Sequence, residues 1–153
     1  MLLPLLAGAS LAACPVDHAR YVLRTAPDVT VGFQRAAASA EWPNGLALTV
    51  RFAKSGRSYW FLPWSGGTSH LQHLASTTDV AAPGWRPPSP DGGPRPLGDV
   101  DYIATDAGYR VIDAAPRPGD AAPAHLLFPN LGDATWHSNH DHAPKQFFDL
   151  VGC

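Results

Sequence analysis

The sequence is poor in charge and in cysteine, and both shortages exclude classes of protein. Charged residues make up 16% of the 153 residues, below the usual share in soluble domains, and the net charge is only −2. This balance gives no electrostatic reason to expect a nucleic-acid partner, and no motif of a nucleic-acid-binding module is present. The two cysteines, Cys14 and Cys153, are too few for a structural zinc site and do not form a Cys-x-x-Cys redox pair.

Recognisable catalytic motifs are also missing. Glu41 is the only glutamate, and the aspartates lie mainly beside glycine, proline or alanine, which is typical of loops rather than of the acid pairs of glycoside hydrolases. There is no Gly-x-Ser-x-Gly elbow, although Ser65, Ser69, Asp79 and the histidines supply the residue types of a catalytic triad. We therefore assign no catalytic residue, and a small hydrolase with a site assembled from distant residues remains an alternative.

Proline and glycine, by contrast, are abundant. The 16 prolines and 14 glycines disfavour helices and favour short strands joined by turns and irregular loops. Aromatic residues make up 10% of the chain, which argues against disorder. Residues 81–98 are the richest in proline and glycine, and we predict a long surface loop there.

The clearest strand pattern lies between residues 46 and 62. After a turn at residues 42–45, four apolar residues alternate with Ala, Thr and Arg, as in a strand with one buried face: Leu46, Leu48, Val50 and Phe52. Residues 54–57 then supply turn chemistry, and residues 59–62 follow as a strand that is apolar on both faces. We predict a central β-hairpin with Tyr59 and Phe61 in the core.

Similar short patterns recur along the rest of the chain. They predict further strands at residues 20–25, 29–34, 100–105, 109–113, 125–128 and 146–151. Thr68 or Ser69 is a candidate cap for one short helix that would carry Leu71 and Leu74 on one side. About seven to eight short strands with hairpin connections indicate a mainly β fold, a single antiparallel sandwich or small barrel spanning residues 14–153.

Residues 1–13 are expected to be a signal peptide. An apolar run precedes the first charged side chain, Asp17, and is too short to span a bilayer unaided. The run ends in Leu11-Ala12-Ala13-Cys14, which resembles the lipobox of bacterial lipoproteins. The resemblance implies that Cys14 becomes the lipidated first residue of the mature chain, and Pro15 after it implies release to the outer membrane where the cell has one.

Two other interpretations of this segment stay open. Small residues such as Ala7-Gly8-Ala9 also suit ordinary signal-peptidase cleavage, which would leave Cys14 as a thiol in an oxidising compartment. Cys14 would then be free or would form a disulfide with Cys153, and the protein would be secreted or periplasmic. Alternatively, residues 1–13 form a buried first element, which Pro4 and the abrupt change to charged residues disfavour.

The residues most suggestive of binding chemistry lie near the C-terminus. Three histidines and one aspartate within six residues offer ligands that suit zinc or copper: His137, His140, Asp141 and His142. On a strand, His140 and His142 would point the same way, and His70 and His73 are candidate distant ligands. A polar, exposed loop explains the cluster equally well, so metal binding is an alternative rather than our first expectation.

Aromatic residues gather around the central hairpin and are a second candidate for binding. Such a group on a sheet can form a platform for a carbohydrate or a partner protein, although most aromatic side chains belong to the core. Trp64 and Trp85 lie next to a Ser-Gly-Gly segment and within the proline-rich loop, respectively, and we expect them to be the exposed contacts.

These observations favour an exported, lipid-anchored domain of the cell envelope that acts as a non-enzymatic binding or accessory module. The expected partners are the membrane, through the N-terminal anchor, and an unidentified protein or carbohydrate. No nucleic acid and no required cofactor are expected. A periplasmic metal-binding protein that holds zinc or copper with the C-terminal histidines is the first alternative, and the small hydrolase is the second.

Overall fold

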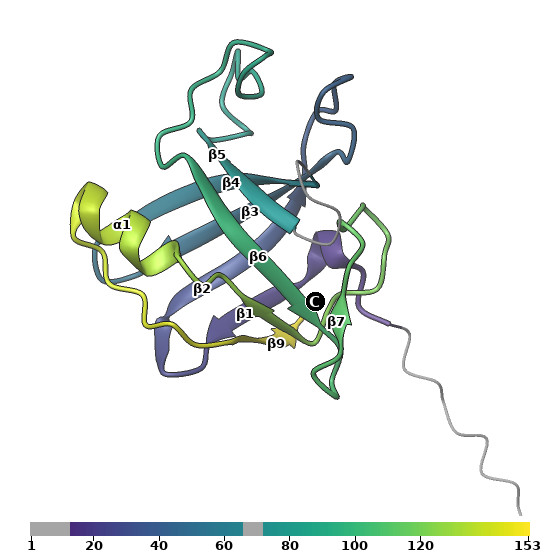
Figure 1. Cartoon of the computed structure of the whole chain (residues 1–153), viewed down its shortest axis with the longest axis vertical. Helices are drawn as coiled ribbons and strands as arrows, with labels where there is room; N and C mark the ends of the chain where they lie inside the picture. The colour runs from purple at the N-terminus through teal and green to yellow at the C-terminus, as the bar shows by residue number, and fades with distance from the viewer. Residues whose placement is uncertain (1–12, 66–71) are drawn as a thin grey trace, which may run out of the picture.

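The computed structural model describes residues 13–65 and 72–153, and most of the regular structure in these ranges is β-sheet (Figure 1). In chain order the elements are η1 (Val16–His18, a 3-10 turn), β1 (Arg20–Leu23), β2 (Ala26–Arg35), β3 (Leu46–Phe52), β4 (Arg57–Ser65), β5 (Gln72–Thr77), β6 (Asp99–Thr105), β7 (Val111–Ile112), β8 (His125–Leu127), α1 (Leu131–Asn139) and β9 (Phe148–Gly152). The expectation of a mainly β fold with at most one short α-helix is confirmed for these residues.

Eight of the strands close into one antiparallel barrel. Their order is β5-β4-β3-β2-β1-β9-β8-β6, and β5 pairs back onto β6, so the ring is complete. The closing ladder joins residues 72–75 to residues 99–102. The two-residue strand β7 is additional and pairs with the end of β6. The sequence patterns left a sandwich and a barrel open, and the structure has the barrel.

Side chains fill the interior of the barrel. Successive side chains of a strand lie on opposite faces, so alternate residues of each strand point inward. The inward set includes large residues that are fully buried, among them Tyr21, Phe61 and Phe148. An eight-stranded barrel is just wide enough to be filled by such side chains. The interior is therefore a hydrophobic core, and we look for a binding site outside it.

The central hairpin has the predicted register. β3 and β4 pair through Leu48↔Phe61 and Val50↔Tyr59, and these four side chains belong to the core. Phe52 is also buried, and its ring meets that of Tyr59 at a centroid distance of 5.6 Å. The assignment of Tyr59 and Phe61 to the core is confirmed.

The segment between β5 and β6 covers part of the outer surface of the barrel. Residues 78–98 pack over β3, β4 and β5, where a second buried cluster contains Trp42, Ala47, Leu62 and Ala75. The Trp42 indole Nε1 donates to the Pro88 carbonyl oxygen at 3.1 Å, which fixes the covering segment. Both faces of β4 are thus covered, as its apolar sequence indicated.

The structure differs from the secondary-structure predictions in three places. The helix expected to carry Leu74 is contradicted by strand β5, and residues 68–71 of that prediction lie outside the described residues. Leu74 faces the core and Ala75 faces the covering segment, so both are buried and no alternation marks the strand. Helix α1 was not predicted, because its Gly, Asp, Thr and Asn residues are poor helix formers. The strand expected at 109–113 is shortened to β7.

The start of the described chain, at residues 13–18, and the C-terminus lie together at the end of the barrel opposite α1 (Figure 1). β1 pairs with β9, and the flanking Cys14 and Cys153 form a disulfide with Cα atoms 5.8 Å apart. This is the pairing considered for an unlipidated Cys14. Most of the lipobox-like segment lies in residues 1–12, outside the described residues, so the signal peptide and lipidation stay predictions. Within the described ranges, no helix is long and apolar enough to cross a membrane.

Phe52→Ala should lower the free energy of unfolding by about 3–5 kcal/mol, because it removes a buried ring from a core that the closed barrel prevents from collapsing. Arg51→Ala, on the exposed face of the same strand, is the matched control and should change it by less than about 0.5 kcal/mol. Denaturant unfolding of both variants measures the difference. Equal, small losses would show that the register of β3 is wrong.

Candidate functional site

Residues from two distant parts of the sequence meet at the α1 end of the barrel. Helix α1 follows β8, and the chain then returns through residues 140–147 to β9. The reversal occurs at His140, which has left-handed backbone angles (φ 59°, ψ 25°) and whose N–H donates to the Trp136 carbonyl oxygen at 2.9 Å. Histidine adopts this conformation more readily than most residues. The turn brings Asp141 to the β3–β4 hairpin.

Asp141 fastens the returning segment to the barrel. Its buried carboxylate accepts a hydrogen bond from Tyr59 Oη at 2.5 Å, and Arg57 Nη1 lies 3.5 Å from the same oxygen. Burial acts to raise the pKa of this carboxyl, but hydrogen bonds from Tyr59 and Ser55 and the positive charge of Arg57 outweigh it and hold the pKa below its ordinary value. Burial and the hydrogen bond to Asp141 raise the pKa of Tyr59 to about 12. The carboxylate is therefore charged and the phenol neutral at neutral pH.

Helix α1 is held against the returning segment by buried contacts. Thr135 is fully buried, and its Oγ1 donates to the Asp141 carbonyl oxygen at 2.9 Å. Gly132 packs directly against Ala143, and a Cβ at Gly132 would collide with the Ala143 carbonyl oxygen. The walls of the space beside the helix are therefore fixed by packing before a ligand binds. This lowers the entropic cost of binding, because the walls do not have to be ordered by the ligand.

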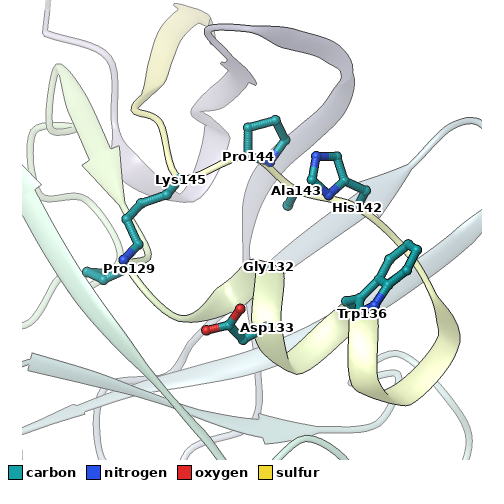
Figure 2. A pocket seen from close by; sticks show the side chains of 8 residues that line it. All are labelled: Pro129, Gly132, Asp133, Trp136, His142, Ala143, Pro144 and Lys145. Carbon is teal, nitrogen blue, oxygen red and sulfur yellow. The ribbon is translucent and has the colours of Figure 1, made fainter.

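A cleft with a volume of about 380 Å³ opens between α1 and the returning segment, and we call it the α1 cleft (Figure 2). Trp136 forms one side and is 49% exposed. Its ring is nearly perpendicular to the imidazoles of His140 and His142, with centroid distances of 5.1 and 6.4 Å. The cleft is lined by Pro129, Gly132, Asp133, Trp136, His142, Ala143, Pro144 and Lys145.

The α1 cleft carries two opposite charges on its two walls. Asp133 projects from the helix, and Lys145 projects from the returning segment (Figure 2). Both residues are exposed, and within the described part of the chain neither forms an ion pair. A carboxylate that accepts hydrogen bonds and an ammonium that donates them are thus both available to a ligand.

A second cleft of about 380 Å³ adjoins the first and shares His142 with it. We call it the hairpin cleft, because the β3–β4 turn forms one wall. Its charged groups are already paired: Lys54 Nζ lies 3.8 Å from Asp28, and Arg57 faces Asp141. The hairpin cleft therefore offers a ligand fewer unpaired groups than the α1 cleft does.

The structure separates the residues expected to bind a metal. His137 lies on the exposed side of α1, where its Nδ1 is 2.7 Å from the Asp133 carbonyl oxygen. The Asp141 carboxylate accepts a hydrogen bond from Tyr59. His140 and His142 both contact the Trp136 ring, and together with Asp141 they line the hairpin cleft. Among residues 13–65 and 72–153 no group of three or more His, Cys, Asp or Glu side chains could hold a metal ion. Zinc or copper binding by these histidines stays an untested prediction.

The other predicted site residues also have assigned positions. His73 lies on β5 with Nδ1 3.4 Å from Asp101, whereas His70 lies outside the described residues. Trp64 and Trp85 are only partly exposed and pack against the second buried cluster on the outer barrel surface. Trp85 donates from Nε1 to Thr77 Oγ1 at 3.0 Å. Neither tryptophan extends freely into solvent.

Sequence reasoning missed the three side chains that give the α1 cleft its character, Asp133, Trp136 and Lys145. None of the three belongs to a predicted strand, and Trp136 lies in a segment, residues 134–142, interpreted only as polar. A tryptophan within such a segment is a usable signal, since a large aromatic residue outside any apolar pattern has no obvious place in the core. The residues around Lys145 give no sign that it belongs to a site, because its place in the cleft depends on the chain reversal at His140.

A further unpredicted cluster lies on the outer face of β8 and β9. Asp149 accepts hydrogen bonds from Arg24 Nε and Nη2 at 2.9 and 2.8 Å and lies 2.7 Å from His125 Nδ1. The Arg24 hydrogen bond is the main cause that holds the pKa of Asp149 below its ordinary value. Tyr109 stacks on His125 at 4.4 Å and accepts from Arg24 Nη2. These groups satisfy one another, so we interpret the cluster as a clasp that holds the β6–β7 turn.

No family model matches the chain, and no curated protein or solved structure matches it either. The function is therefore argued from the geometry of the site.

Asp141→Asn should lower the free energy of unfolding by about 1–3 kcal/mol at neutral pH, because the charge-assisted hydrogen bond from Tyr59 is weakened. The folded-state pKa of Asp141 lies below the ordinary 3.8, so this stabilisation is present above about pH 4 and is lost as the pH falls through the lowered pKa. Denaturant unfolding at several pH values measures the difference between wild type and variant. Asp133→Asn, which changes an exposed carboxylate in the first turn of α1, is the control. If Asp141→Asn lowers the free energy of unfolding by the same amount at low pH as at neutral pH, the stabilisation does not come from the charged carboxylate.

Proposed function

We propose that this protein is an exported, non-enzymatic binding module that takes its ligand in the α1 cleft. The observation that carries the proposal is the half-exposed indole of Trp136 on a rigid cleft that also presents an unpaired carboxylate and an unpaired ammonium group. Clefts of this volume that combine an aromatic surface with a few polar groups are the usual form of small-molecule binding sites. Because side chains fill the interior of the barrel, a ligand has no space there, and this supports a site on the outside.

The distribution of hydrogen bonds favours binding over catalysis. General acids and bases need a protonatable group that is held by neighbours and still faces the substrate. Two carboxylates that several partners hold, Asp141 at the α1 end and Asp149 on β9, use their oxygens for contacts with Tyr59, Arg24 and His125. Asp133 and Lys145 are open to a ligand, but they are exposed groups on separate walls. Such groups suit recognition.

Export is the second part of the proposal, and two features support it. The N-terminal segment has the apolar run and the small residues of a signal peptide, although no Lys or Arg precedes the run. Disulfides such as Cys14–Cys153 persist in oxidising compartments. Lipidation and the disulfide compete for the same sulfur of Cys14. Because the Cα atoms of the two cysteines are 5.8 Å apart, within the range of ordinary disulfides, we propose the bridged, soluble form over the lipid-anchored one.

Export in the bridged form predicts the reactivity of both cysteines. Mature protein, produced with its own N-terminal segment and unfolded without reductant, should not react with a thiol reagent, whereas both cysteines should react after reduction. Closing the long loop is expected to contribute about 4–5 kcal/mol to stability in the chain-entropy model. Mass spectrometry measures the thiol labelling before and after reduction. Labelling of Cys153 before reduction, together with acyl mass on Cys14, would contradict this form and favour the lipid anchor.

Binding in the α1 cleft predicts which amides respond to a ligand. Full-length mature protein, isotope-labelled for amide NMR, should be titrated with three probe classes: neutral trisaccharides, charged trisaccharides and a mixture of short peptides. At least one class should shift the amide signals of Gly132, Trp136, His142 and Lys145, and the probe should be recovered intact. The proposal fails if no class shifts these signals, or if the probe is chemically converted.

A further inference from the structure

We infer that the ligand of the α1 cleft is an uncharged saccharide whose ring stacks on Trp136 while its hydroxyls bond to Asp133 and Lys145. The inference rests on the proposed function and names its ligand class. Three properties of the cleft carry it: the exposed indole, the balance of charge and, among the described residues, the lack of a second large exposed hydrophobic side chain beside the indole.

The indole of Trp136 is exposed but positioned. It lies nearly perpendicular to the rings of His140 and His142, at interplanar angles of 81° and 87°. Its backbone is part of α1, whose packing against Ala143 is fixed by Gly132. An aromatic side chain has few rotatable bonds, so a positioned ring provides contact area at low entropic cost. The apolar face of a sugar ring is a flat surface that fits such a support.

The charges around the cleft disfavour a ligand that carries a charge of one sign. An anion drawn to Lys145 would meet the unpaired carboxylate of Asp133, and a cation drawn to Asp133 would meet Lys145. In Figure 2 these two side chains belong to facing walls of one cleft. A hydroxyl group donates one hydrogen bond and accepts others. A neutral polyhydroxylated ligand can therefore satisfy both groups at once without bringing like charges together.

The surroundings of Trp136 do not resemble the centre of a protein interface. Such interfaces bury at least about 1,000 Å² and have an apolar centre with aromatic anchors. The large exposed hydrophobic residues of the described chain are Tyr109, Val111, Trp136 and Val151. Of these only Trp136 lines the α1 cleft or the hairpin cleft. A single large aromatic side chain, beside small apolar residues and a few polar groups, suits a small polar ligand better than a protein surface.

The inference is tested by calorimetric titration of the full-length mature protein with defined trisaccharides. Maltotriose, cellotriose and the N-acetylglucosamine trimer are the neutral probes, whereas trigalacturonate and the glucosamine trimer carry charges of opposite sign. At least one neutral probe should bind about tenfold more tightly than both charged probes. Its affinity should change by less than about twofold between low and high salt, because no net charge is neutralised. Tighter binding of either charged probe would overturn the inference.

Variants of the cleft separate stacking from hydrogen bonding. Trp136→Ala should lower the affinity for the neutral probe by at least about tenfold, and Trp136→Phe should lose less of the affinity. Asp133→Asn and Lys145→Gln should each weaken it by a few-fold. Val151→Ala truncates another exposed apolar side chain, outside both clefts, and should leave binding unchanged. Amide spectra confirm that each variant is folded. Unchanged binding in folded Trp136→Ala would overturn the inference.

Two failures are distinguishable. If peptides shift the signals of the α1 cleft while no saccharide does, the ligand class is wrong and the binding module stands. If neither saccharides nor peptides shift them, the proposed function fails together with this inference.

Discussion

The pairing of β5 with β6 is the constraint on which the rest of the structure depends. Four residue pairs, from Gln72↔Tyr102 to Ala75↔Asp99, convert an open sheet into a closed barrel. Closure leaves none of the eight barrel strands with a long free edge, which removes the usual route to edge-to-edge association. It also confines the inward side chains to a space that they fill. Because the interior is used for stability, a ligand has to bind on the outside, where loops and α1 shape the surface.

Asp141 links this closed core to the candidate site. Helix α1 is short, and its sequence has little intrinsic tendency to be helical, so it depends on tertiary contacts. Those contacts are the hydrogen bonds of Asp141 with Tyr59 and Thr135 and the close packing of Gly132 on Ala143. The same contacts fix both walls of the α1 cleft. Asp141 therefore contributes to stability through its carboxylate and to the shape of the cleft through its backbone carbonyl oxygen as well.

Local patterns predicted the strands that have one covered face, such as β3 with its alternation from Leu46 to Phe52. They could not predict β5, because residues 78–98 cover its outer side and hide the alternation, nor the closing ladder, whose partners are separated by that segment. Because the closing ladder could not be predicted, the sequence could not decide between a sandwich and a barrel. The candidate site was largely beyond sequence reasoning. The histidine cluster marked the correct region, but the left-handed turn at His140 sends its members in different directions. The turn also brings Lys145 to face Asp133, which no spacing in the sequence encodes.

Native-state hydrogen exchange of the backbone amides that pair β5 with β6 tests most directly whether the barrel is closed around a filled interior. Exchange of amides in a closed ring requires opening of the whole barrel. If the barrel is closed, the hydrogen-bonded amides of residues 72–75 and 99–102 exchange as slowly as those of the central β3–β4 pair. Exchange at these residues that is faster by orders of magnitude would show an open sheet edge and would contradict the barrel.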